Sequence, residues 1–360
     1  MTSHRLGGHS VIDGRLVLDP AISARLRELA AAADYDSVWP RENIQLLNGA
    51  DVPRWSVRPD YGGVGLSGLE LQEAYHELGR ACLTTAFILS QREAAARRLD
   101  TSRDRPIAQE MLPRLAKGEL WSTVGVAQLT SSRQHLGPTL KARVTPATLH
   151  LDGYVPWVTG AAASDFLIIG AIDEADAPLL AVVPKESKGL RIASPMDLVA
   201  LRGSCTTEVH FDGVALDRKF LLEDRPELVN AGDGAGGLTT SCLALALAAG
   251  ALDHLVQESK ARPELTSMIE RLKHRHDELW KELADLAQSA EPDASRFPRL
   301  RAAATQTALR TTQAALTASK GMGFVQPHPA QRWARQALFF LVWSCPRPTA
   351  QAVMESLCEV

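Results

Sequence analysis

The sequence has little of what marks a secreted, membrane-spanning or metal-binding protein. Its five cysteines are scattered over 360 residues and form no Cys-x-x-Cys pair, so the sequence predicts reduced thiols without a disulfide framework or a zinc site. The N-terminus lacks the apolar core of a signal peptide. No segment reaches the ~18 uninterrupted apolar residues of a membrane helix. We therefore expect a cytoplasmic protein without a bound metal.

A strong charge of either sign is also missing. The formal net charge is -3, which offers no basic surface for a nucleic acid or an anionic membrane. Partners of both kinds are therefore not expected. The length of 360 residues and the 45% hydrophobic content are sufficient for two or three domains with large cores.

Patterning divides the chain into three zones, which together predict an α+β fold with segregated helical and β blocks. Residues 1–120 predict an N-terminal helical domain, residues 121–228 a central antiparallel β-sandwich or barrel, and residues 229–360 a C-terminal helical bundle. Ser67 and Glu70 form a capping box that predicts a helix start. The predicted helices span residues 21–33, 67–79, 107–115, 243–254, 267–288, 297–320 and 329–342.

Common functional motifs are either absent or not supported by the residues around them. Gly63, Gly65 and Gly68 fit G-x-G-x-x-G, but the apolar strand that a dinucleotide site requires does not precede them. His274 and His276 lie two positions apart, so on a helix they point in different directions and predict a solvated charged face, not a metal pair. A P-loop and a G-x-S-x-G elbow are both absent from the sequence.

The segment Tyr154–Gly160 is the most informative one. It precedes Phe166–Gly170, an apolar run that predicts a buried strand. Trp157 offers a flat ring and Thr159 a hydrogen-bonding hydroxyl two positions later, which together suit the wall of a planar cofactor. A buried core Trp followed by a turn explains the same residues, so these residues alone leave both interpretations open.

Five segments, in order, resemble motifs of the acyl-CoA dehydrogenase superfamily of flavoproteins over most of residues 20 to 225. They are Pro59–Ser67, Leu112–Glu119, Val126–Thr130, Trp157–Thr159 and Leu201–Val214. The C-terminal third is similar more weakly, through Gly321–Phe324 and Gln331–Arg335.

The resemblance implies that FAD is held between the β domain and the C-terminal helices. It places Leu129 and Thr130 at the pyrimidine edge of the flavin, Trp157 beside the ring system and Thr159 near flavin N5. Gly321 would then allow close backbone approach to the pyrophosphate. The resemblance also implies a homodimer or homotetramer.

The sequence departs from the family where the chemistry takes place. The α-proton base of the family is a Glu near the C-terminus, and Ser344 stands at that position, followed by Cys345. Ser241 or one of its neighbours stands where other members carry the base, and this segment has no carboxylate either. A neutral Ser is not a strong base without an activating group. The family's Arg-x-x-Phe-Gly contact to FAD is missing after Gln257, and the helical hairpin there is shorter.

Three functions fit this pattern. The first is an FAD-dependent oxidoreductase, which acts on the CH–CH group of an acyl thioester and takes its base from Glu93, Glu355 or Cys345. The second is a flavin-dependent monooxygenase of the same fold, which needs no such base and for which His135 and His328 are candidate proton donors. The third is an inactive scaffold or ligand-binding member of the family.

Overall fold

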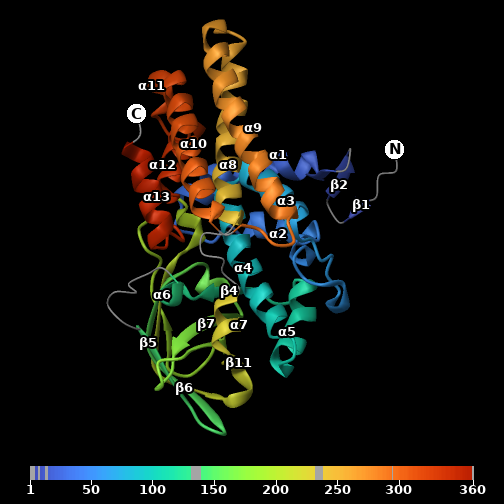
Figure 1. Cartoon of the computed structure of the whole chain (residues 1–360), viewed down its shortest axis with the longest axis vertical. Coiled ribbons are helices and arrows are strands. Elements are labelled where there is room, and N and C mark those ends of the chain that lie inside the picture. The colour runs from blue at the N-terminus through green and yellow to red at the C-terminus, as the bar shows by residue number, and fades with distance from the viewer. Residues whose placement is uncertain are drawn as a thin grey trace.

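The computed structural model describes residues 5–6, 9–12, 15–130, 139–231, 238–293 and 295–358. Figure 1 shows an elongated molecule with a helical half and a β half, joined along α4 and α5. N-terminal helices, a central β-sheet and a C-terminal helical domain form the predicted α+β arrangement. The exact boundaries of the three predicted domains stay a prediction.

The N-terminal part packs helices around a small antiparallel sheet that patterning did not predict. The helices predicted at residues 21–33, 67–79 and 107–115 are confirmed. The elements are β1 (Arg5–Leu6), β2 (His9–Ile12), β3 (Arg15–Leu18), α1 (Pro20–Tyr35), α2 (Arg41–Gly49), α3 (Gly68–Ala81), α4 (Leu83–Thr101) and α5 (Pro106–Ala116).

The predicted capping box at the start of α3 is wrong in its chemistry. Ser67 is the N-cap residue, but its side chain makes no capping hydrogen bond. Gly68 has φ +52° and lies against α9, where an added Cβ would come within 2.8 Å of the Ala287 carbonyl oxygen. Backbone packing against another helix therefore fixes the start of α3, and only glycine fits there.

The β half is one predominantly antiparallel sheet in the order β11-β8-β7-β5-β6-β10-β9. Its exceptions are β4 and β5, which both pair in parallel with β7. The chain passes through β5 and β6 between β4 and β7. This long connection allows β4 and β7 to run in the same direction side by side. The strands are β4 (Ser122–Gly125), β5 (Leu140–Val144), β6 (Thr148–Val158), β7 (Phe166–Ile172), β8 (Pro178–Pro184), β9 (Leu190–Ile192), β10 (Thr207–Asp217) and β11 (Leu221–Glu223).

The continuous apolar run of β7 is explained by burial on both of its faces. Phe166 and Ile168 pack into the core shared with α4 and α5. Leu167 and Ile169 point to the opposite face and pack in the core of the β domain itself. A strand buried on both sides needs no polar alternation.

The C-terminal part is built around α8, whose predicted position is confirmed. This helix is long and apolar enough to cross a membrane by composition, but 78% of its apolar window is buried inside the molecule. Gly79 of α3 lets the two helices approach, since a Cβ there would lie 2.9 Å from Ala246 Cβ. The elements are α7 (Pro226–Ala231), α8 (Leu238–Ser259), α9 (Thr266–Gln288), α10 (Arg296–Ala318), α11 (Lys320–Gly323), α12 (Pro329–Phe339) and α13 (Arg347–Cys358).

Candidate functional site

Trp157 stands at the end of β6 with its ring half exposed. Its neighbours Val155 and Val158 are fully buried, whereas 51% of Trp157 is accessible to solvent. The backbone of Trp157 has φ +61°, a left-handed conformation that is rare for a bulky residue and costs about 1–2 kcal/mol. The alternative of a core Trp is therefore wrong, and the ring is available to a ligand.

A short chain of hydroxyl groups lies behind Trp157. The Thr159 Oγ1 atom is 3.1 Å from Thr206 Oγ1, which is 2.9 Å from Ser204 Oγ. All three residues are buried. A hydroxyl can accept one hydrogen bond while it donates another, so Thr159 can accept from Thr206 and keep its own proton for an acceptor on a ligand.

The loop that carries Thr159 is fixed by close packing and backbone bonding. The Gly160 N–H donates to the Ser204 carbonyl oxygen at 2.9 Å. A Cβ on Gly160 would come within 2.5 Å of the Trp39 ring, and Gly160 has φ +62°. The two loops at residues 157–160 and 201–206 thus form one rigid edge of the β domain.

Leu129 and Thr130 lie on α6 (Ala127–Thr130), which is a single helical turn. The Gln128 Nε2 atom donates to the Gly170 carbonyl oxygen at 2.5 Å, which ties this turn to β7. Leu129 fills the space beside Gly170, since a Cβ there would lie 2.5 Å from Leu129 Cδ1. The side chain of Thr130 lies outside the described residues.

Gly321 and Ser344 lie in the C-terminal helical part. Gly321 is exposed on α11, and an added Cβ would meet no atom within 4 Å. Its glycine character is therefore not required by contacts within the described chain. Ser344 lies in the turn after α12, with φ +45°. The roles of both residues stay predictions.

The turn that carries Ser344 rests on a buried arginine that sequence reasoning missed. The Arg301 Nη2 atom donates to the carbonyl oxygens of Phe340 at 2.9 Å and Trp343 at 3.1 Å. Among the described residues its Nε and Nη1 atoms have no hydrogen-bond partner. Burial lowers the pKa of Arg301 to about 9, which reflects a cation with no carboxylate beside it.

Aromatic rings form the surroundings of the same turn. Phe87 of α4 makes edge contacts with Phe339 and Trp343, each with ring centroids 4.9 Å apart. Phe339 and Trp343 stack at 5.0 Å. An apolar wall of this kind suits an acyl chain. No regular spacing links α4 to this turn in the sequence, so the wall could not be predicted.

The alternative bases lie in different settings. Glu93 is buried, and its Oε1 atom pairs with Arg97 Nε at 3.1 Å. Glu355 is exposed on α13 and accepts from Gln351. Burial raises the pKa of the Cys345 thiol, and nearby Arg301 opposes that shift. Of the three, only Cys345 adjoins the turn at Ser344.

The histidines are distributed differently from expectation. His328 caps α12, where its Nδ1 atom accepts from the Ala330 N–H at 3.2 Å, and His135 lies outside the described residues. His276 is buried, with its Nε2 atom 3.4 Å from that of His76, so the prediction of a solvated face is wrong for His276. No group of three or more potential ligand side chains for a metal occurs within the described ranges.

Comparison with known proteins identifies relatives of this fold. Residues 20–119 match the family described as "Acyl-CoA dehydrogenase, N-terminal domain". A probable acyl-CoA dehydrogenase of Bacillus subtilis is 25% identical over 344 residues, which cover 86% of this chain and 87% of that protein.

Two solved structures are similar over nearly the whole chain. Butyryl-CoA dehydrogenase from Megasphaera elsdenii has a TM-score of 0.81 at 18% identity, covering 94% of this chain and 97% of that one. Glutaryl-CoA dehydrogenase from Mycobacterium smegmatis, solved in complex with FADH2, has a TM-score of 0.78 at 16% identity and covers 94% of both chains. At these identities the likeness establishes the fold.

Proposed function

We propose that this chain is a member of the acyl-CoA dehydrogenase superfamily, and that it is an FAD-dependent oxidoreductase acting on the CH–CH group of an acyl thioester. The match of residues 20–119, the relative of 25% identity and the shared fold support this proposal. The observation that carries this proposal is Trp157, whose half-exposed ring is held in a strained backbone conformation. Strain of this kind clusters at ligand sites. Its neighbour Thr159 supplies a hydroxyl at the same edge.

The residues at this edge fit a flavin. Trp157 would lie against the ring system, and Thr159 would donate toward N5 while Thr206 donates to Thr159. Leu129 and Thr130 would meet the pyrimidine edge. Gly321 leaves open space for a pyrophosphate group, because no Cβ projects there. FAD, when bound, supplies the acceptor for two electrons.

Ser344 stands where the family carries its glutamate, and we propose that it does not act as the base. A serine hydroxyl remains protonated near neutral pH unless a base activates it, and no carboxylate occurs between Phe340 and Pro346. We assign proton acceptance from the substrate to Cys345, which follows Ser344 directly. Burial raises the pKa of the Cys345 thiol, and Arg301 beneath the turn opposes that shift without reversing it.

The test is the visible spectrum of the purified chain, followed by anaerobic addition of acyl-CoA thioesters of several chain lengths. We expect a protein-bound flavin whose oxidised bands bleach with at least one thioester. Cys345→Ser should retain the flavin and lose the bleaching. A protein that binds no flavin would overturn the assignment and leave the scaffold function.

A monooxygenase of the same fold is the second candidate, because the turn after α12 holds only Ser344 and Cys345 where dehydrogenases have a glutamate. The two functions separate in one experiment. A flavin that no thioester bleaches, but whose chemically reduced form consumes O₂ faster when an organic substrate is present, identifies the oxygenase. Ser344→Glu should raise thioester-dependent bleaching only in a dehydrogenase pocket.

A further inference from the structure

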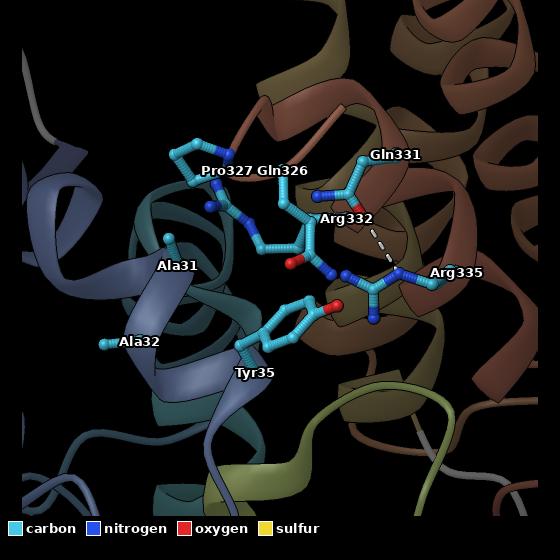
Figure 2. A pocket seen from close by; sticks show the side chains of 8 residues that line it. All are labelled: Ala31, Ala32, Tyr35, Gln326, Pro327, Gln331, Arg332 and Arg335. Carbon is cyan, nitrogen blue, oxygen red and sulfur yellow. Dashed lines mark hydrogen bonds between the residues drawn. The ribbon is translucent and has the colours of Figure 1, made fainter. Parts of the chain in front are cut away.

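A small pocket lies between the end of α1 and the first turns of α12, away from the edge that carries Trp157. Its volume is about 170 Å³. Ala31 and Tyr35 of α1, the loop residues Gln326 and Pro327, and two arginines of α12 form its walls (Figure 2). Nothing in the proposed flavin chemistry uses this pocket.

One of the two arginines, Arg335, already has a carboxylate partner in the protein. Its Nε donates to Gln331 at 2.9 Å and its Nη1 to the Val199 carbonyl oxygen at 2.8 Å. Its Nη2 atom is 2.8 Å from the carboxylate of Asp34, which is fully buried. Asp34 also accepts from the Leu201 N–H at 2.9 Å. The charge of Arg335 is thus already balanced.

The other arginine, Arg332, is left without an anion. Only 8% of Arg332 is exposed, and its guanidinium makes no hydrogen bond or ion pair with any residue that the structure describes. Its guanidinium lies 5.9 Å from the ring centroid of Trp333. Figure 2 shows the side chain extended across the pocket toward Ala31 and Pro327. Burial lowers the pKa of Arg332.

A buried guanidinium with no partner is destabilising, because removing a charge from water is costly unless hydrogen bonds and an opposite charge compensate. Asp34 is the acid that acts on Arg332, and it is already engaged by Arg335. An oxyanion in the pocket would supply both missing elements, since the planar guanidinium matches a carboxylate or phosphate with two parallel hydrogen bonds.

We propose that this pocket binds the phosphate or carboxylate group of a small-molecule ligand, with Arg332 as the binding cation. The Tyr35 hydroxyl and the Gln326 amide, which line the same pocket, are further donors. Because the walls come from α1 and α12, a bound oxyanion joins these two helices and stabilises their packing. The proposal stands independently of the flavin assignment.

The test measures thermal unfolding of the full chain at constant ionic strength, while chloride is replaced by inorganic phosphate or by acetate. A ligand that binds the folded state raises Tm with its concentration. We expect such a rise for the parent protein, and a larger response to one of the two anions identifies the chemical source. Arg332→Gln should lower the affinity of the protein for the anion at least ~10-fold, as expected for loss of a charge-assisted hydrogen bond.

A second variant keeps the test decisive if Arg332→Gln does not fold. Ala31→Glu places a carboxylate on the wall that Arg332 approaches, and should raise Tm in chloride and remove the phosphate and acetate responses. Arg41→Gln, at an exposed arginine at the start of α2, is the matched control and should respond like the parent.

Several results would overturn the proposal. They are a parent Tm that does not depend on either anion, an equal response in Arg332→Gln, and an unchanged response in Ala31→Glu. A parent protein without an anion response whose Arg332→Gln variant elutes as a smaller species would instead assign the missing anion to a second copy of the chain.

Discussion

Trp157 combines two features that each lower the stability of the folded chain. A left-handed φ at a bulky residue costs about 1–2 kcal/mol, and a ring that is 51% exposed gains only part of the roughly 25 cal/mol per Å² that apolar burial provides. The residue is therefore better explained by a ligand that covers its ring than by packing.

Trp157→Gly should separate stability from binding. Glycine adopts φ +61° without strain. We therefore expect the ligand-free variant to unfold at the parent Tm or above it, with a free energy of unfolding that is higher by up to about 1 kcal/mol. The affinity for FAD should fall at least ~10-fold if the ring stacks on the flavin. Thermal unfolding and a fluorescence titration with FAD measure the two quantities.

Trp157→Phe is the matched control, because it keeps a flat ring in the same backbone conformation. It should retain most of the FAD affinity and show no gain in stability. A Trp157→Gly protein that binds FAD as the parent does, but unfolds at a lower temperature, would mean that the ring serves packing alone.

For single residues, the sequence identifies candidate site residues more easily than it predicts their conformations and contacts. The pairing of Trp157 with Thr159 could be predicted from their separation of two positions in the sequence. The left-handed φ of Trp157 could not, since it depends on contacts of the following loop with Trp39 and Ser204. Arg301 and Thr206 were missed because their partners are distant in the chain and no local period connects them.

At the scale of single elements, Glu223, the last residue of β11, connects the β half of the molecule to the helical half. Its buried carboxylate accepts from Ser102 Oγ at 2.8 Å and from Arg225 Nε at 2.6 Å. Arg105 Nη2 lies 3.6 Å away. Ser102 and Arg105 follow α4 and precede α5, so this cluster ties the edge of the sheet to the helical part.

Acid should loosen this junction. Burial raises the pKa of Glu223, but the hydrogen bonds from Arg225 and Ser102 outweigh burial and lower the pKa to about 2. An unfolded glutamate titrates near ~4.3. The stabilisation by Glu223 is therefore fully present above that value and is lost as pH falls toward 2, on the order of 2–3 kcal/mol in the free energy of unfolding.

Glu223→Gln removes the titrating group and keeps its shape. We expect the variant to be less stable than the parent at pH 7, and the difference between them to shrink as pH decreases from 5 to 2.5. Urea unfolding at a series of pH values measures this. Glu355→Gln, at an exposed residue of α13, is the control, and an equal change in both variants would contradict a special role for Glu223.

Elements with strong periodicity were predictable, whereas elements that depend on distant contacts were not. The apolar core of α8 and the amphipathic pattern of α9 identify these helices directly. The strands β1–β3 are too short to carry a pattern, and α13 begins between two prolines, Pro346 and Pro348. The parallel pairing of β4 depends on where α5 delivers the chain, which no local pattern encodes.

At the scale of the whole molecule, apolar side chains around the end of α11 are exposed to solvent. Met322 is 68% exposed, Phe324 81% and Val325 52%. Met322 lies in α11 next to Gly321, and Phe324 and Val325 follow the end of this helix. A cluster of exposed apolar side chains commonly marks a protein interface. We expect a second copy of the chain to cover it, in the homodimer or homotetramer that the resemblance implies.

Phe324→Glu should therefore change both assembly and cofactor content. A charge at the centre of an apolar contact opposes association, so sedimentation analysis should give a smaller species than the parent. If Gly321 approaches the pyrophosphate of a flavin held by the neighbouring copy, flavin occupancy should fall in the same variant. Leu357→Glu, at an exposed leucine of α13 (54% exposed), should leave both unchanged.

The two readouts together locate the cofactor relative to the subunit boundary. Loss of assembly with full flavin occupancy would mean that each copy holds its flavin with its own residues, and would remove Gly321 from the site. Loss of flavin from an intact oligomer would place the loop at the cofactor but not at the interface. A parent chain that is already monomeric would contradict the interface and leave the exposure of Phe324 to be explained by a different partner.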